Sequence, residues 1–293
     1  SKSVMRSAVQ KSTIPASRIF VAYDLRDKHF DPTWHAHEEY QVFLVLKGTG
    51  TRFIGNTVTS FGPGDLTLLG PHVPHLWRSD DRYFDKQDDE HTEGLVIYFR
   101  EDLLGGLMEK EEMKPVKSLF AKAQRGIEFY GGIIQQVGEQ MKRIALAHGT
   151  ESLILLLSIL DSLAHTKDFH LLHPSAYTQT LKETETDRIN VVYNYVVQHF
   201  REPIALEAVA ELLHMTPTSF SRYFRIKTSK SSSGFLSELR IRHACKLLSE
   251  DDGKNINGVC YECGFNTLSN FNRQFKTFMK MTPREYREKF LSL

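Results

Sequence analysis

Cysteine is scarce in this chain, and long apolar segments are missing. Its 293 residues include three cysteines, Cys245, Cys260 and Cys263, which are too few and too clustered for a disulfide framework. The longest apolar runs, residues 153–157 among them, are five residues long, far short of the roughly 20 residues that span a bilayer. The first ten residues hold no continuous apolar segment, so no secretory signal is expected. These absences exclude a disulfide-stabilised secreted scaffold and a helical membrane protein, and they predict a reducing, cytoplasmic setting.

An excess of charge of one sign is also absent, because 37 Lys and Arg residues balance 36 Asp and Glu residues. The ordinary composition, 41% hydrophobic and 25% charged, excludes a disordered chain, a collagen and a coiled-coil rod. The length suggests about two domains. From Asp187 onward, however, 16 basic residues face 11 acidic ones, whereas the preceding part has 21 against 25. A basic C-terminal part indicates a polyanion-binding module, although an imbalance of this size is also common on solvated surfaces.

The N-terminal third has the pattern of short β-strands. Segments rich in Val, Leu, Phe and Thr are separated by glycine- and proline-containing turns, and they cover residues 41–46, 51–54, 66–69 and 94–99. Strands of this length and spacing predict a sandwich or a small barrel.

The middle of the chain has helical periodicity. Apolar residues recur at three- and four-residue steps from Ile133 to Ile144, which predicts an amphipathic helix. A second helix is expected over residues 151–165, where leucines surround nearly the whole circumference, so burial on more than one side is expected. This pair of helices either forms a dimer interface or packs on the β-domain, and the pattern leaves both open. The polar residues 178–187 are expected to form a linker.

The most specific pattern is an internal repeat in the last hundred residues. The sequence FSRYFR at residues 220–225 recurs as FNRQFK at residues 271–276. Each copy follows a short predicted helix, residues 206–213 in the first and 256–263 in the second, and Gly264 is a natural helix stop. Thr216 and Thr267 are predicted N-caps, with Pro217 at the first helical position. Helix, tight turn and helix predict two helix-turn-helix units.

The second helix of each unit combines a buried side with a polar side. Phenylalanines four residues apart, Phe220 with Phe224 and Phe271 with Phe275, anchor the helix, and polar and cationic residues lie opposite. Arg can fork onto guanine, Asn can pair with adenine, and Ser or Thr can reach phosphates. One such helix would be typical of any solvated surface, but two matching copies predict DNA contact. The predicted contact residues are Thr218, Ser219, Ser221, Arg222 and Arg225 in the first unit, and Leu268, Ser269, Asn272, Arg273 and Lys276 in the second.

One helix, predicted over residues 234–248, joins the two units. A rigid connection would place the two recognition helices in adjacent major grooves, about 34 Å apart. Arg240 is expected to stabilise this connecting helix rather than to read bases. Thr282 and Glu285 form a predicted capping box that opens a last helix.

The last hundred residues resemble the AraC family of bacterial transcription regulators. The resemblance implies promoter DNA as the partner and RNA polymerase as a further candidate partner. The chain departs from the family pattern after the first recognition helix. The family usually has a Gly there and then a Phe or Tyr, whereas this chain has Ser229 and Ser232, which predicts a looser loop. The residues that carry the resemblance are 210–215 (AELLHM), 220–224 (FSRYF), 239–241 (LRI) with Ala244 and 247–248 (LL), 264–265 (GF), 271–276 (FNRQFK), and Thr282-Pro283 with Tyr286-Arg287.

Two segments of the N-terminal part, residues 34–48 and 64–75, are similar to the two cupin motifs. Where metal-binding cupins have two His, a Glu and a final His, this chain has His35, His37, Gln41 and His75. Gln in place of Glu removes the anionic ligand that hard cations favour, although three imidazoles can still hold a transition metal. Cupin domains of AraC-type regulators usually bind a small molecule without metal, so neither a metal nor another cofactor is expected. The predicted ligand-binding residues are Trp34, His35, His37, Gln41, His75 and Trp77, the tryptophans either stacking on a sugar or forming core.

Together these patterns predict a multidomain α and β protein. Residues 1–125 are expected to form a cupin-like β-barrel that senses a ligand, 126–177 a helical dimerisation segment, 178–187 a linker, and 188–293 an all-α DNA-binding domain. The predicted function is a homodimeric transcription regulator, not an enzyme, that responds to a small-molecule effector. The alternatives are a metal-dependent cupin enzyme or metal sensor fused to a DNA-binding domain, and a ligand-independent regulator. The pair Cys260 and Cys263 is expected to be core rather than a redox or zinc motif.

Overall fold

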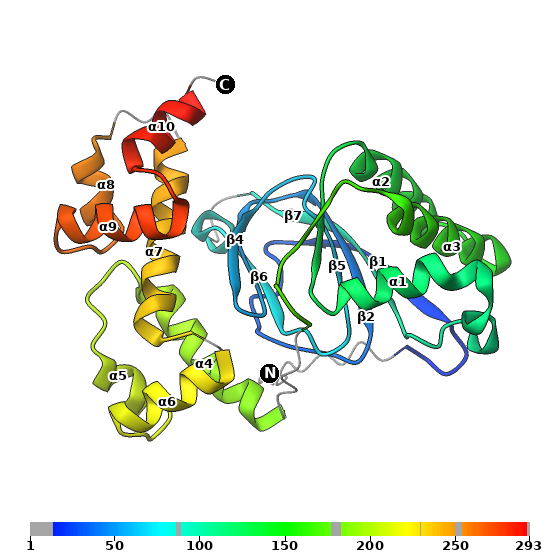
Figure 1. Ribbon diagram of the computed structural model, residues 1–293, viewed down its shortest axis with the longest axis horizontal. Coiled ribbons are helices and arrows are strands. Elements are labelled where there is room, and N and C mark those ends of the chain that lie inside the picture. Colours follow the sequence, from blue (N-terminus) through cyan, green and yellow to red (C-terminus); the bar gives the residue numbers. More distant parts are fainter. Residues whose placement is uncertain (1–13, 86–88, 177–182, 229, 250–253, 292–293) are drawn as a thin grey trace. The chain divides into compact units, whose positions relative to one another are not determined.

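A computed structural model describes residues 14–85, 89–176, 183–228, 230–249 and 254–291. The chain divides into two compact units, Ser1–Leu181 and Lys182–Leu293 (Figure 1). In the described ranges, no helix combines the length and the apolar character that a membrane crossing requires.

The first unit is built on two antiparallel sheets. The larger sheet has the strand order β1-β7-β2-β5-β8-β9 and the smaller sheet has the order β4-β3-β6. The strands are β1 (Phe20–Asp27), β2 (Tyr40–Lys47), β3 (Gly50–Ile54), β4 (Thr57–Phe61), β5 (Leu66–Leu69), β6 (His75–Ser79), β7 (Thr92–Phe99), β8 (Ile127–Phe129) and β9 (Phe169–Leu171). The four predicted strands are confirmed as β2, β3, β5 and β7.

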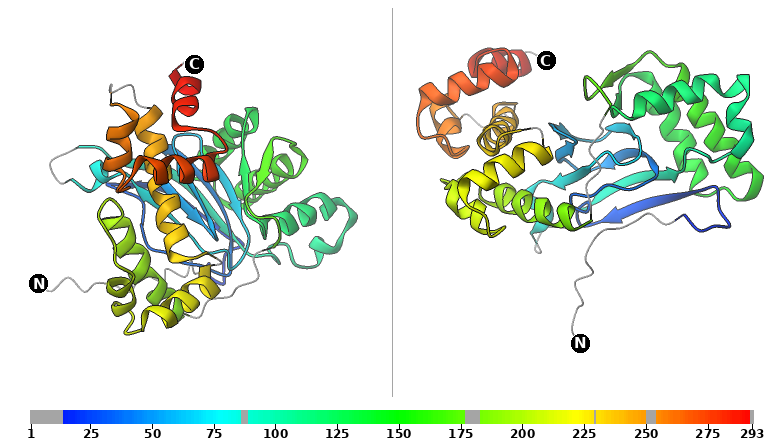
Figure 2. Two further views of the ribbon diagram at one scale, coloured as in Figure 1. Left: turned by 60° about the vertical axis from the view of Figure 1, so that its left-hand side comes forward. Right: turned by 60° about the horizontal axis from the view of Figure 1, so that its bottom comes forward.

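Alternation along the strands of the larger sheet separates two cores. In β2, Val42 and Leu44 belong to the core shared with the helices, whereas Phe43 and Val45 belong to the core between the sheets. Successive side chains of a strand point to opposite faces, so this assignment follows from the sequence of β2 itself. The outer face is covered by α1 (Lys114–Ala123), α2 (Gly132–Ile144) and α3 (Gly149–His165), as Figure 2 shows. The predicted β-rich fold is confirmed as two sheets packed face to face under a layer of helices.

The middle segment, residues 126–177, contains the two predicted helices as α2 and α3. It also holds β8 and β9, which extend the larger sheet and were not predicted. Helix α3 packs against α1 and α2 and contributes Leu156, Ile159, Leu160 and Leu163 to the core shared with the larger sheet, while Ile154 is 61% exposed on the other side. One side of α3 is therefore core, and the predicted burial of a second side is not present among the described residues.

The boundary of the predicted linker differs from the structure. Residues 178–182 lie outside the described residues, and helix α4 (Glu183–His199) already includes 183–187. Residues 183–187 are thus helical rather than linker. Helix α1 and the short helices η1 (Asp81–Phe84), η2 (Gly105–Glu109) and η3 (Glu111–Met113) were also not predicted.

The second unit is helical throughout its described residues. Beyond α4 it contains α5 (Leu206–Glu211), α6 (Pro217–Thr228), α7 (Ser232–Ser249), α8 (Ile256–Glu262), α9 (Leu268–Met279) and α10 (Pro283–Leu291). Helix α7 runs between the pair α5–α6 and the pair α8–α9 (Figure 1). The two predicted helix-turn-helix units and the connecting helix are confirmed. Cys245, Cys260 and Cys263 are buried and unpaired, as expected of core residues.

Local capping interactions set the starts of the recognition helices. The Oγ1 atoms of Thr216 and Thr267 accept hydrogen bonds from the backbone N–H groups of Ser219 (3.2 Å) and Asn270 (3.3 Å). Thr282 and Glu285 exchange the two hydrogen bonds of a capping box, at 2.6 and 3.2 Å. These three predicted caps are confirmed.

Candidate functional site

Helix α6 presents most of its predicted DNA-contacting residues to solvent. Phe220 and Phe224 are fully buried, and they fix the rotation of the helix about its axis. Thr218, Ser219, Arg222 and Arg225 are exposed on the opposite side, but Ser221 is half-buried. Ser221 lines an apolar groove toward α4 and α7, so the structure separates it from the other four. Ile226, 54% exposed, also lies on the outward face and was not among the predicted residues.

Helix α9 repeats this arrangement. Phe271 and Phe275 are fully buried, and all five predicted contact residues are exposed: Leu268, Ser269, Asn272, Arg273 and Lys276. The guanidinium of Arg273 donates a hydrogen bond to Asn270 Oδ1 at 2.9 Å. Asn272, Arg273 and Lys276 line a surface depression together with Arg284. Arg284, at the start of α10, is a cation that the helix pattern alone could not assign to this face.

The predicted ligand-binding histidines converge in the first unit. His35 and His75 form a β-bridge with backbone hydrogen bonds of 3.2 and 2.9 Å, and His37 lies two residues further along. One ring nitrogen from each of the three histidines lies within 4.8 Å of the others. In the part of the chain that the structure describes, no other group of His, Cys, Asp or Glu side chains is close enough to hold a metal ion. The structure therefore brings together residues about 40 positions apart, as their resemblance to the two motifs predicted.

Backbone carbonyls determine the tautomer of each histidine. Each Nδ1 atom lies near a carbonyl oxygen, that of Thr33 for His35 (2.7 Å), Glu39 for His37 (2.9 Å) and Val73 for His75 (2.7 Å). A carbonyl oxygen can only accept, so each Nδ1 carries the hydrogen. In the neutral rings the Nε2 atoms are consequently acceptors with free lone pairs.

Burial keeps these rings neutral. It lowers the pKa of His35, takes that of His37 to about 4, and lowers that of His75 well below its usual value. The neighbouring histidines add to the effect at His37 and His75, because a second positive charge would be repelled. Uncharged imidazoles whose Nε2 atoms carry no hydrogen can accept hydrogen bonds or ligate a metal.

Gln41 completes the cluster from β2. Its amide oxygen lies 3.2 Å from Nε2 of His37 and 3.1 Å from Nε2 of His75. Three acceptors facing one another are unfavourable, and two arrangements relieve the conflict. The amide can turn by 180° and donate both N–H groups to the rings, or a cation can accept the lone pairs. A set of three imidazoles and an amide oxygen suits a first-row transition metal better than Mg²⁺ or Ca²⁺.

A buried carboxylate lies behind the cluster. Glu39 is 5% exposed, and its Oε2 is 3.7 Å from Nδ1 of His37. A carboxylate behind a ligating histidine orients the ring and offsets positive charge at the site. Glu39 was not among the predicted residues, because it stands between His37 and Gln41 at a position that the cupin pattern does not use.

The two predicted tryptophans are core residues, and the ring of Trp77 contacts that of His75 at 5.6 Å between centroids. Trp34 is 2% and Trp77 is 4% exposed. The ring of Trp77 meets that of Phe43 edge-on at 4.8 Å between centroids, and its Nε1 donates to Asp65 at 3.5 Å. Asp65 forms an ion pair with the fully buried Arg52. The core between the sheets therefore extends from the histidines to the buried ion pair of Arg52 and Asp65, which the sequence patterns did not identify.

A cavity lies on the helix-covered side of the larger sheet. Its volume is about 750 Å³, within the range of small-molecule sites. The lining combines Tyr40 and Phe120 with charged groups, including Arg100 and Lys117. Burial raises the pKa of Tyr40 to about 12, so its hydroxyl remains a hydrogen-bond donor. No sequence motif marked this cavity, because its residues come from β2, α1 and the irregular segment after β7.

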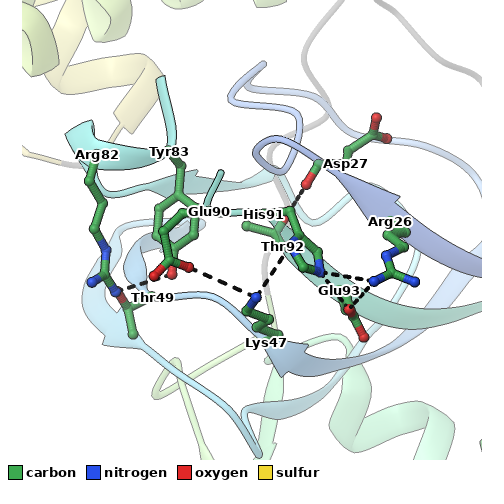
Figure 3. Close-up of polar contacts among 10 residues, drawn as sticks. All are labelled: Arg26, Asp27, Lys47, Thr49, Arg82, Tyr83, Glu90, His91, Thr92 and Glu93. Carbon is green, nitrogen blue, oxygen red and sulfur yellow. Dashed lines mark hydrogen bonds and ion pairs between the residues drawn. The ribbon is translucent and has the colours of Figure 1, made fainter. Parts of the chain in front are cut away.

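An exposed network of polar contacts joins the ends of β2 and β7 (Figure 3). Lys47 Nζ donates to His91 Nδ1 at 3.2 Å, and His91 Nε2 donates to Glu93 at 2.6 Å. The hydrogen bond from His91 lowers the pKa of Glu93. These charges already neutralise one another at the surface, where water screens them, so this network differs from the buried histidine cluster with its free lone pairs.

Comparison with known proteins identifies both units. The family model for an AraC-like ligand-binding domain matches residues 17–167, which is more than half of the chain, and a helix-turn-helix domain model matches residues 209–289. The chain belongs to the AraC family of transcription regulators. It is therefore a DNA-binding regulator with a ligand-binding domain.

Relatives of this AraC-family regulator span its whole length. The HTH-type transcriptional activator RhaS of Escherichia coli (strain SE11) is 22% identical over 278 residues, 94% of each chain. The structure of ToxT from Vibrio cholerae is 15% identical and covers 92% of this chain and 98% of that one, with a TM-score of 0.35. The DNA-binding domain of AdpA, a global transcriptional factor crystallised with a target DNA, is 25% identical over 34% of this chain and 90% of its own, with a TM-score of 0.33.

Proposed function

We propose that this AraC-family regulator reads promoter DNA with helices α6 and α9 under the control of a small-molecule effector. The observation that carries the DNA contact is the repeated geometry of the two helices. In both, two buried phenylalanines fix the rotation, and the cations Arg222 with Arg225, or Arg273 with Lys276, are exposed opposite them. Exposed cations and short polar groups on a helix of this kind suit the major groove and its phosphates.

We place the effector site at the cluster of His35, His37, Gln41 and His75. Its buried donors and acceptors lie beside the ring of Trp77, 5.6 Å from that of His75 between centroids, a combination that suits a polyhydroxylated ligand such as a sugar. The effector would bind two arrangements of the regulator with different affinity. Its binding would therefore shift the population toward the arrangement that it binds more tightly. The proposal includes a homodimer, cytoplasmic DNA as the target and RNA polymerase as a further partner.

The DNA part is tested by selection from random-sequence duplexes with the full chain. We expect enrichment of one sequence with two sub-sites, bound well above the affinity for unrelated DNA at the same salt concentration. Binding that depends on salt alone, with no enriched sequence, would contradict it.

The effector part is tested by thermal shift with sugars, sugar acids and aromatic acids, because a ligand of the native state raises its apparent stability. A compound that stabilises the protein and changes its affinity for the selected DNA supports the proposal. His75→Ala should abolish this response, whereas Lys117→Ala in the 750 Å³ cavity should leave it intact. The reverse pattern would move the effector to that cavity, and a flat screen favours the ligand-independent regulator.

A second candidate function is a metal-responsive regulator. The observation that favours it is the convergence of the three imidazoles, two of which direct Nε2 at the Gln41 amide, with the Glu39 carboxylate behind His37. We expect Co²⁺ or Zn²⁺ to bind in a 1:1 ratio in calorimetry and Co²⁺ to give d–d absorption bands. Gln41→Glu should bind at least about tenfold tighter because it adds an anionic ligand. His91→Ala, outside the cluster, is the matched control, and unchanged metal binding by His37→Ala would refute this candidate.

A further inference from the structure

The two helix-turn-helix units meet where the chain leaves α4. Helix α4 ends at His199, so the carbonyls that follow have no partner within the helix. The guanidinium of Arg240, in the middle of α7, donates to the carbonyl oxygens of Phe200 (2.6 Å, from Nε) and Glu202 (2.7 Å, from Nη2). The connecting helix is thus tied to the segment that leads into the first helix-turn-helix unit.

The turn of the second unit packs against the same segment. Gly264, between α8 and α9, has a φ of +83°, and a Cβ atom there would lie 2.7 Å from the carbonyl oxygen of Arg201 and 2.8 Å from that of Phe200. Backbone therefore lies directly against backbone, and no side chain can be accommodated without separating the two. The next residue, Phe265, has its ring centroid 5.8 Å from the Arg240 guanidinium.

These contacts form a clasp of three parts, which we define as residues 200–202, Arg240 and Gly264. Residues 200–202 lead into the first helix-turn-helix unit, Arg240 belongs to α7, and Gly264 belongs to the turn of the second unit. Helix α7 already contributes Ile241, Ala244 and Leu248 to the core of the second unit. The clasp adds a further attachment, because it joins the turn of that unit directly to the segment that leads into the first one.

We propose that this clasp determines the spacing between the two DNA sub-sites that α6 and α9 can occupy together. Arg240 and Gly264 are positioning residues in this proposal, which rests on the proposed DNA contacts of the two helices. A preset distance lets the second helix bind without a further loss of conformational freedom. Displacing a sub-site by one base pair moves it along the duplex and rotates it about the duplex axis. A rigid pair of helices cannot follow this change.

The test compares the selected duplex with versions in which one or two base pairs are inserted or deleted between the sub-sites. For the wild-type chain, each change should lower the affinity by about 10- to 100-fold, comparable with the loss of base contacts. Gly264→Ala should bind the original duplex several-fold more weakly, and its penalty for altered spacing should fall to about threefold or less. Arg240→Ala should behave in the same way, with partial rescue in Arg240→Lys, which keeps the charge but not the fork of donors.

Gly258→Ala is the matched control, because Gly258 lies in α8 of the same unit outside the clasp. It should retain the wild-type spacing penalty. Circular dichroism identifies variants that fail to fold, in which case Arg240→Lys decides the question. A uniform loss of affinity at every spacing, or an unchanged penalty in folded variants, would overturn the proposal. A wild-type chain that enriches no sequence would instead refute the proposed DNA contacts.

Discussion

At the scale of single residues, the buried histidines couple stability to pH. Burial lowers the pKa of His35, His37 and His75 in the folded state, whereas in the unfolded chain each is about 6.5. Below pH 6.5 the unfolded state therefore binds protons that the folded state does not. The resulting stability is present above this pH, and it is lost as the pH falls toward the folded value, about 4 for His37.

We therefore expect the metal-free first unit to lose stability between pH 6.5 and 4, by up to about 1.4 kcal/mol per pH unit for each histidine. Tryptophan fluorescence reports this unit, since the two tryptophans of the chain are Trp34 and Trp77. Urea unfolding with a chelator present, at several pH values, measures the slope. In His37→Gln the number of protons taken up on unfolding, which this slope measures, should fall by about one. An identical slope would contradict the assignment.

Single cations on α6 and α9 should account for much of the DNA affinity. Arg222 and Arg273 are exposed at equivalent positions of the two repeats. Arg222→Ala or Arg273→Ala should each cost about 1–3 kcal/mol of binding free energy, measured by fluorescence anisotropy at fixed salt. Arg143→Ala, an exposed arginine on α2, controls for the change in net charge. Wild-type affinity and sequence discrimination in both variants would show that these faces do not contact the bases.

At the scale of elements, the start of α7 leaves an apolar groove unfilled. The groove has a volume of about 240 Å³ and is lined by Val196, Phe224 and Phe235 among others, with Ser232 at its edge. Ser232 stands where the family usually has an aromatic residue. The missing ring explains why the groove exists next to α6.

Ser232→Phe should fill this groove and raise the free energy of unfolding of the second unit by about 1 kcal/mol. The reason is burial of an aromatic side chain without displacement of its neighbours. Urea unfolding followed by circular dichroism measures the change. Ser269→Phe is the control, because Ser269 is exposed on α9 and does not line the groove, so a ring there would remain in water. Equal effects of both substitutions would argue against the groove as the cause.

At the scale of the whole molecule, the outer side of α3 is the proposed dimer interface. Ile154 is 61% exposed there, although the opposite side of the helix is fully buried in the first unit. Ile154→Asp should weaken self-association at least about tenfold, because a carboxylate would be buried at an apolar interface. Sedimentation equilibrium measures the dissociation constant. Leu107→Asp replaces another exposed apolar residue, 58% exposed, and should leave association unchanged. A monomeric wild-type chain would refute the interface.

The limits of sequence-based prediction follow from the range of the interactions involved. The recognition helices were predictable because their caps, their paired phenylalanines and their exposed cations lie within about 15 residues of one another. Helix α1 and strands β8 and β9 were not, since short elements acquire their stability from the sheet and core on which they pack. Ser221 shows the same limit on a smaller scale. Its type and position suit a DNA contact, but packing against α4 and α7 turns it toward a groove.

The amino-acid sequence by itself determined the two-part organisation, the helix-turn-helix repeat and the residue types of the histidine cluster. These features depend on local periodicity, capping and spacing, which are properties of short stretches of chain. Only the tertiary structure decided that His35, His37 and His75 converge, with His37 and His75 facing Gln41, and that Arg240 and Gly264 contact residues 200–202. Both arrangements join distant segments, so strand register and helix packing determine them, and neither is encoded in any one stretch of the chain.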